Sequence, residues 1–178
     1  MNGTASDILV KYLEQEGVEY LFGVPGGHLL QLYDAVHRAG SIKPILTKHE
    51  AWAALMAYGY AATSGKIVVC CRTVGPGATN LVTGVASAYM DSVPMLVLTA
   101  QVGTSGIGRG ALQEGTGIGR TVNQVALFDK ITKLSTMEWS VACPPSLKAS
   151  SWPSPVWRPW APPLLPVWVP SSEGRRAR

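Results

Sequence analysis

Apolar and polar positions follow two alternating periods from Thr4 to about Leu134. Stretches with an apolar residue every third or fourth position predict helices, and short stretches that are apolar throughout predict strands. A first helix is expected to begin at Thr4 or Ser6, which would cap it, and to end at Gly17. Further helices are expected at 29–38, 50–63 and 78–89. Strands are expected at 18–24, 42–46, 67–72 and 94–100.

One helix separates each expected strand from the next, and the strands are apolar on both faces. This pattern predicts a three-layer, Rossmann-like, doubly wound parallel sheet with helices on both faces. Ligands of such sheets bind beyond the carboxyl ends of the strands. Any chemistry is therefore expected on the four loops that follow the strands, at 24–27, 47–50, 73–77 and 101–104.

The composition changes abruptly after about Ser135. From Met137 onward the chain has nine of its thirteen prolines and five of its six tryptophans, but one of its nineteen glycines. Proline lacks the backbone N–H that a helix or sheet needs, and this segment contains many prolines. An irregular, disordered tail is therefore expected. We predict a domain at 1–136 and this tail at 137–178. The tail is either a proline-rich ligand for a groove-binding module or the product of a shifted reading frame.

Charge and cysteine content exclude several classes of protein. Residues 1–136 carry ten Lys and Arg against nine Asp and Glu, so the net charge of +4 arises mainly in the tail, and no basic stripe indicates nucleic-acid binding. No apolar run reaches 18 residues and no basic-then-apolar leader begins the chain, so we expect a cytoplasmic protein without a membrane span. Three cysteines, two of them adjacent, form neither a disulfide framework nor a metal-ligand spacing.

Several short motifs stand in a fixed order on this α/β frame. They are VEYLFGVPGG at 18–27, Lys48-His49-Glu50, GPGATN at 75–80 and AYMDSVPMLVLTAQV at 88–102. Together they resemble the N-terminal domain of the acetolactate synthase family over most of residues 4–134. Each piece alone is a weak signal, but their order and spacing make the set specific.

The resemblance implies a domain that binds the pyrimidine end of thiamine diphosphate. It implies that Glu50, which directly follows His49, hydrogen-bonds ring nitrogen N1′, stabilises the 4′-imino tautomer and so promotes removal of the thiazolium C2 proton. From the residues alone, Glu50 is better explained as a solvated carboxylate at a helix start, and the resemblance reverses that preference. The reaction implied is decarboxylation of a 2-oxo acid such as pyruvate followed by carboligation, as in branched-chain amino acid biosynthesis.

The resemblance also implies further contacts. The pyrimidine pocket would be lined by Pro25, Gly26, Thr73, Pro76 and Asn80, which from the residues alone could be a cluster of turns and caps. Gln113 would face the substrate end of the cofactor. Leu112 stands where these synthases usually carry Phe, which puts the acceptor substrate in doubt, and the glycine-rich loop 103–119 could equally be a plain flexible loop.

No metal ligands are predicted in this chain. His28 and His49 are not at a metal-ligand spacing, and His49 is expected to orient Glu50 or to pack beside it. The resemblance assigns Mg²⁺ to a second, diphosphate-binding domain with Gly-Asp-Gly and paired asparagines, which have no match here. It also makes FAD a candidate cofactor, and a homo-oligomer or a diphosphate-binding partner is expected.

Three interpretations stay open at this point. The chain is a truncated, frame-shifted part of such an enzyme that is inactive alone, or a small subunit that a separate diphosphate-binding subunit completes. The third is a non-enzymatic nucleotide binder on a Rossmann-like sheet, for which the glycines at 106–110 are the only support. These glycines follow a late strand instead of the first one, which weakens that interpretation.

Overall fold

The computed structural model describes residues 4–136 and the backbone of 164–169. Its centre is a six-stranded sheet with strand order β2-β1-β3-β4-β6-β5. Strands β1 to β4 are parallel, whereas β6 runs antiparallel to both β4 and β5. The strands are β1 (Tyr20–Gly23), β2 (Lys43–Leu46), β3 (Val68–Arg72), β4 (Met95–Ala100), β5 (Leu134–Ser135) and β6 (Leu164–Val169).

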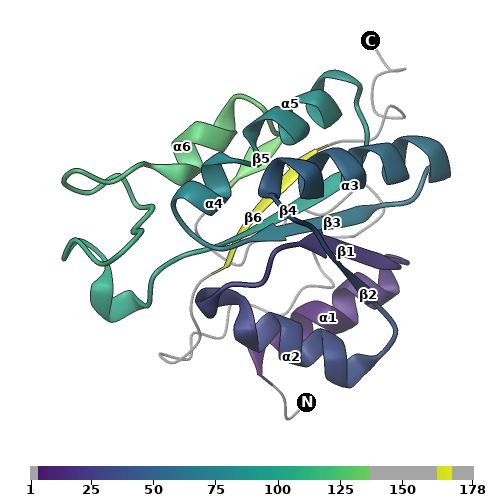
Figure 1. The fold of residues 1–178 in the computed structure, drawn as a ribbon, viewed down its shortest axis with the longest axis horizontal. Coiled ribbons are helices and arrows are strands. Elements are labelled where there is room, and N and C mark those ends of the chain that lie inside the picture. The colour runs from purple at the N-terminus through teal and green to yellow at the C-terminus, as the bar shows by residue number, and fades with distance from the viewer. Residues whose placement is uncertain (1–3, 137–163, 170–178) are drawn as a thin grey trace.

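Helices cover both faces of this sheet, so the domain has the three layers that the sequence predicts. Helices α1 and α2 lie on one face, and α3, α4, α5 and α6 lie on the other (Figure 1). The α-helices are α1 (Ala5–Gln15), α2 (Leu30–Ala39), α3 (Glu50–Ser64), α4 (Pro76–Thr79), α5 (Val82–Met90) and α6 (Gln124–Asp129). Two short 3₁₀ helices are η1 (Gly27–Leu29) and η2 (Thr104–Gly106).

The first helix begins where its sequence predicts. The Thr4 side chain accepts a hydrogen bond from the backbone N–H of Asp7, and the Asp7 carboxylate accepts one from the backbone N–H of Thr4. This reciprocal capping box satisfies two donors that the first turn of a helix leaves unpaired. Gly40 and Gly65 follow α2 and α3 in the left-handed conformation, which ends both helices.

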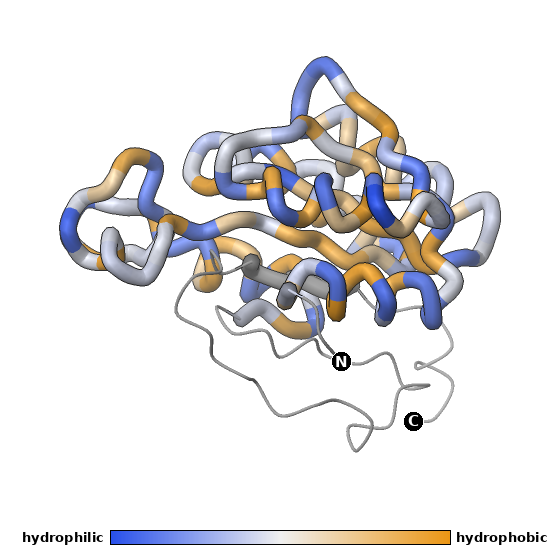
Figure 2. The backbone as a smooth tube through the Cα atoms, turned by 90° about the horizontal axis from the view of Figure 1, so that it is seen from below, coloured by the Kyte–Doolittle hydropathy of each residue, from blue (hydrophilic) through white to orange (hydrophobic). Residues whose placement is uncertain are grey.

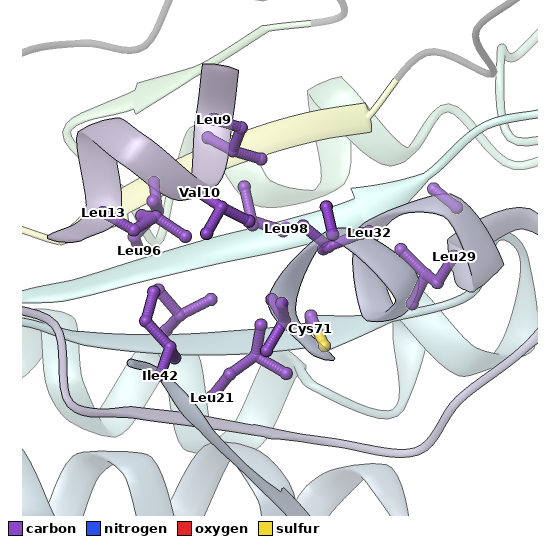
Figure 3. Close-up of a cluster of buried hydrophobic side chains, with 14 of the residues drawn as sticks. Leu9, Val10, Leu13, Leu21, Leu29, Leu32, Ile42, Cys71, Leu96 and Leu98 are labelled. Atoms are coloured by element: carbon purple, nitrogen blue, oxygen red, sulfur yellow. The ribbon is translucent and has the colours of Figure 1, made fainter. Parts of the chain in front are cut away.

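Alternation along the strands divides the core into two clusters. In β3, Val69 and Cys71 face α1 and α2, while Val68 and Cys70 face α3 and α5. Figure 3 shows the first cluster, where leucines of α1 and α2 pack on Leu21, Leu96 and Leu98 of the sheet. In Figure 2 the chain through the middle layer is mostly hydrophobic, whereas hydrophilic residues recur along the helices and loops outside it. This arrangement is the one that a sheet buried on both faces requires.

Two of the expectations about elements differ from the structure. The single helix expected at 78–89 is two helices, because the N–H of Leu81 bonds to the carbonyl of Ala78 three residues back and the chain turns there. Within the stretch predicted to be irregular, 164–169 forms β6 beside β4. Val167, Trp168 and Val169 favour strands, which offsets the donor that Pro166 lacks. The rest of that tail lies outside the described residues.

Candidate functional site

The candidate site lies at the carboxyl ends of β1 and β3, beside the start of α3. Glu50 is the first residue of α3, and His49 caps the helix by accepting a hydrogen bond from the backbone N–H of Ala51 at 3.2 Å. The sheet and the helix together leave only 7% of Glu50 exposed. A carboxylate this buried requires partners, because desolvation destabilises its charge.

Three side chains supply those partners. The Asn80 carboxamide donates to Glu50 Oε2 at 3.0 Å, and Arg72 pairs with Glu50 Oε1 through Nη2. His49 Nε2 lies 3.6 Å from Glu50 Oε2. His49 therefore lies beside Glu50, as expected. Both carboxylate oxygens have a partner from the protein itself.

The environment of Glu50 acts on its pKa in two directions. Burial raises the pKa, while the backbone N–H at the helix start, the Asn80 carboxamide, the Arg72 guanidinium and His49 all lower it. The lowering contributions win, and the pKa of Glu50 lies below its ordinary value. The Glu50 side chain is therefore a carboxylate at neutral pH.

The turns after β1 and β3 are in direct contact. A Cβ on Gly26 would lie 2.7 Å from the Cβ of Thr73, so only a glycine lets these two loops approach so closely. Thr73 is buried, and its hydroxyl lies 3.5 Å from Nδ1 of His28. Pro25 and Pro76 lie on the exposed side of the same two turns. The predicted pocket residues therefore come together at one end of the sheet.

The loop after β4 reaches the same place. A Cβ on Gly75 would lie 2.9 Å from the Cβ of Gln113, so Gln113 is packed against the Gly-Pro-Gly turn. Gln113 is exposed and has a φ of 64°, in the left-handed region. The structure thus puts the residue that was expected at the substrate end beside the turn that carries Asn80.

The glycines at 106–110 do not offer free backbone donors. The Glu114 carboxylate accepts hydrogen bonds from the N–H groups of Gly108, at 2.6 Å, and Gly110, at 3.1 Å, as well as from the Thr116 hydroxyl, at 2.5 Å. Hydrogen bonds from Thr116, Gly108 and Gly110 lower the pKa of Glu114. The backbone donors that a nucleotide phosphate would need are therefore already paired with a carboxylate of the chain itself.

Arg72 and Glu114 were not predicted from the sequence as residues with buried polar contacts. Arg72 is a charged residue at the end of an otherwise apolar strand, and Glu114 is an acid that follows a glycine-rich loop. A charged residue in either position is a sequence signal of a buried charge. Among the described residues, no group of three or more His, Cys, Asp or Glu is placed to hold a metal ion. No helix in the described part is long and apolar enough to cross a membrane.

The fold and site define a class: an α/β domain whose parallel sheet presents a buried glutamate and a Gly-Pro-Gly turn at its carboxyl end. Residues 3–125 match the family described as thiamine pyrophosphate enzyme, N-terminal TPP binding domain, and the chain belongs to that family. The expected family and the expected parallel α/β fold are both confirmed.

Several acetolactate synthases are similar to this chain. The acetolactate synthase large subunit of Lactococcus lactis is 51% identical over 118 residues, which are 66% of this chain and 20% of that protein. The isozyme 3 large subunit of Escherichia coli is 45% identical over 132 residues, which are 73% of this chain and 23% of that protein. The acetolactate synthase of Arthrospira platensis is 51% identical over 114 residues, which are 62% and 20%. The chain thus spans about a fifth of the length of these relatives.

Proposed function

We propose that this chain binds the aminopyrimidine ring of thiamine diphosphate, with Glu50 as the group that acts on the ring nitrogen. The observation that carries the proposal is the position of Glu50: a buried carboxylate at the carboxyl end of the sheet, hydrogen-bonded to Asn80 of the turn after β3. This is the edge of a parallel sheet where ligands bind.

The residues around Glu50 fit a flat, polar heterocycle. Gly26 and Gly75 carry no Cβ, so the two turns can pack closely on Thr73 and Gln113, while Pro25 and Pro76 are exposed and offer rigid apolar surface. Asn80 and Thr73 provide a carboxamide and a hydroxyl for the ring substituents. The Glu50 carboxylate would hold the proton at the ring nitrogen.

The bound cofactor would supply the electron sink, its thiazolium ring, for decarboxylation of a 2-oxo acid. Our proposal for the substrate is a 2-oxo acid such as pyruvate, and for the product a carboligated acid, since the relatives are acetolactate synthases. Gln113 is proposed to face this substrate. The proposed cofactor site is completed by a diphosphate-binding domain or subunit that holds Mg²⁺, with FAD as an additional cofactor of the assembled enzyme.

Substitution of Glu50 tests the proposed function. The variant Glu50→Gln keeps the shape of the side chain but removes its charge, and thiamine should bind about tenfold more weakly or worse, because a hydrogen bond to a charged group contributes roughly 1.5–3 kcal/mol. Isothermal titration calorimetry of the folded chain with thiamine measures this.

The matched control is Glu19→Gln. Glu19 lies before β1, at the opposite end of the sheet, and pairs with Lys66 and Tyr60. Its loss should leave thiamine affinity unchanged. Equal affinity of wild type and Glu50→Gln, with both proteins folded by circular dichroism, would disprove the assigned role of Glu50.

A further inference from the structure

Arg72 is the last residue of β3, and its guanidinium bridges two parts of the candidate site. Nη2 pairs with Oε1 of Glu50, and Nη1 donates to the backbone carbonyl of Val24 at 3.0 Å. The side chain of Arg72 is 16% exposed and that of Glu50 is 9% exposed, so most of the ion pair is shielded from water. The Coulomb attraction within a pair so little screened by solvent is stronger than within a pair on the surface.

The fold makes room for this guanidinium at one glycine. A Cβ on Gly77 would lie 2.6 Å from Nε and 2.8 Å from Cγ of Arg72, so only a residue without a side chain is accommodated there. The fit is nevertheless incomplete. Nε is buried and has no hydrogen-bond partner among the described residues, and an unpaired buried donor carries a desolvation penalty.

We propose that Arg72 is an internal competitor for Glu50, and that its guanidinium must give up the Glu50 carboxylate before that group can hold the cofactor's ring nitrogen. This inference rests on the proposed function. The carboxylate stabilises positive charge on the ring nitrogen. When a guanidinium already neutralises the carboxylate, a second cation at the same oxygens is destabilised. Arg72 is thus a positioning residue that sets how strongly this chain binds the ring.

Neutral replacements of Arg72 should strengthen binding. For Arg72→Met, we expect thiamine to bind about tenfold more tightly, measured by calorimetry on the full chain, where tenfold corresponds to about 1.4 kcal/mol. Arg72→Gln is a second neutral variant, whose carboxamide can still donate to the carbonyl of Val24. Arg72→Lys keeps the charge and should stay within about threefold of wild type, given that a tenfold change would need about 1.4 kcal/mol.

A second measurement follows Glu50 without any cofactor. In a ¹³C NMR titration of the Glu50 carboxyl, both neutral variants should shift the midpoint to higher pH, whereas Arg72→Lys should not. Arg38→Met is the matched control. Arg38 pairs with Asp7 and Asp34 on α1 and α2, far from the site, so its loss should change neither thiamine affinity nor the Glu50 titration.

The outcomes separate this inference from the proposed function. If neither neutral variant binds thiamine more tightly than wild type while Glu50→Gln binds more weakly, Arg72 is no competitor and the role of Glu50 stands. If the Glu50 titration is the same in all variants, the ion pair has no effect on the carboxyl and the inference is also overturned. If Glu50→Gln binds thiamine as well as wild type, the proposed function fails, and this inference fails with it.

Discussion

The two adjacent cysteines of β3 are buried on opposite faces of the sheet. Cys71 lies among the side chains of α1 and α2, with its sulfur 3.3 Å from the hydroxyl of Tyr33, and Cys70 lies among those of α3 and α5. Burial raises the pKa of both thiols, and that of Cys71 rises to about 12 even though Tyr33 and Arg72 lower it. Because the thiolate is the reactive form of cysteine, neither side chain is suited to redox or nucleophilic chemistry.

We therefore expect slow alkylation of both cysteines. In the folded chain at pH 8, iodoacetamide should modify Cys70 and Cys71 at least about a hundredfold more slowly than in urea, since both the thiolate and access are lacking. Peptide mapping by mass spectrometry measures the modification of Cys70 and Cys71 separately from that of Cys143. Ser105→Cys, at an exposed position of η2, provides a reactive reference. Labelling of Cys70 or Cys71 at the rate of that reference would contradict their burial.

Some site residues could be predicted from the sequence and others could not. The family resemblance assigned Glu50 and Asn80 to the same site, and the structure joins them by a hydrogen bond, while their roles stay a prediction. Arg72 could not be assigned a partner, because its contact with Glu50 joins β3 to α3 and depends on the space at Gly77. Such a contact depends on the packing of three elements, which local periodicity does not encode.

At the scale of elements, α3 and α5 approach each other through small residues. A Cβ on Gly84 of α5 would lie 2.4 Å from the Cβ of Ala54 and 2.8 Å from the backbone of α3. Ala53, Ala54 and Ala57 are fully buried along this contact. The close packing fixes α3 on the sheet, and Glu50 is the first residue of that helix.

Two glycine substitutions with opposite expected signs test this contact. Gly84→Ala should lower the free energy of unfolding by about 1–3 kcal/mol, because the added methyl meets backbone that cannot move aside. Gly59→Ala lies within α3, where nothing is within 4 Å of the added Cβ. It should raise the same free energy by about 0.5–1 kcal/mol through helix propensity alone. Urea unfolding measures both, and equal stability of the two variants would contradict the packing.

Elements with strong periodicity were predicted well, and short ones were not. The eight helices and strands expected up to Ala100 all have a counterpart, with ends that differ by a few residues and one helix that is broken at Asn80 and Leu81. Helix α6 and strand β5 are too short to show a period. Strand β6 was missed because its pairing with β4 joins residues more than sixty positions apart.

At the scale of the molecule, the parallel strands and the antiparallel edge have different roles. The carboxyl ends of β1 and β3 carry the candidate site, while β6 and β5 extend the sheet beyond β4. The expected division into 1–136 and 137–178 stays a prediction, although β6 joins the second segment to the sheet of the first. The candidate site thus lies at one end of a sheet whose far edge contributes none of the residues assigned to it.

From the charges at the site we predict how well the whole chain distinguishes thiamine from thiamine diphosphate. The residues assigned to the ring are neutral apart from Glu50, and the neighbouring cation, Arg72, is already paired with it. The residues assigned to the site therefore present no free cation to a diphosphate, and thiamine and thiamine diphosphate should bind within about threefold of each other, with or without Mg²⁺, a difference below about 1 kcal/mol. Calorimetry with both compounds measures this ratio.

The same reasoning predicts no turnover by the purified chain. A ring held without its diphosphate is poorly oriented for reaction, and orientation is a large part of catalysis. With pyruvate, Mg²⁺ and thiamine diphosphate, the chain alone should form no acetolactate above a protein-free blank, and addition of a separate diphosphate-binding domain should be needed for activity. Product formation by the chain alone that Glu50→Gln abolishes would show that its own residues hold the diphosphate, and the proposed division of the cofactor between two domains would then be wrong.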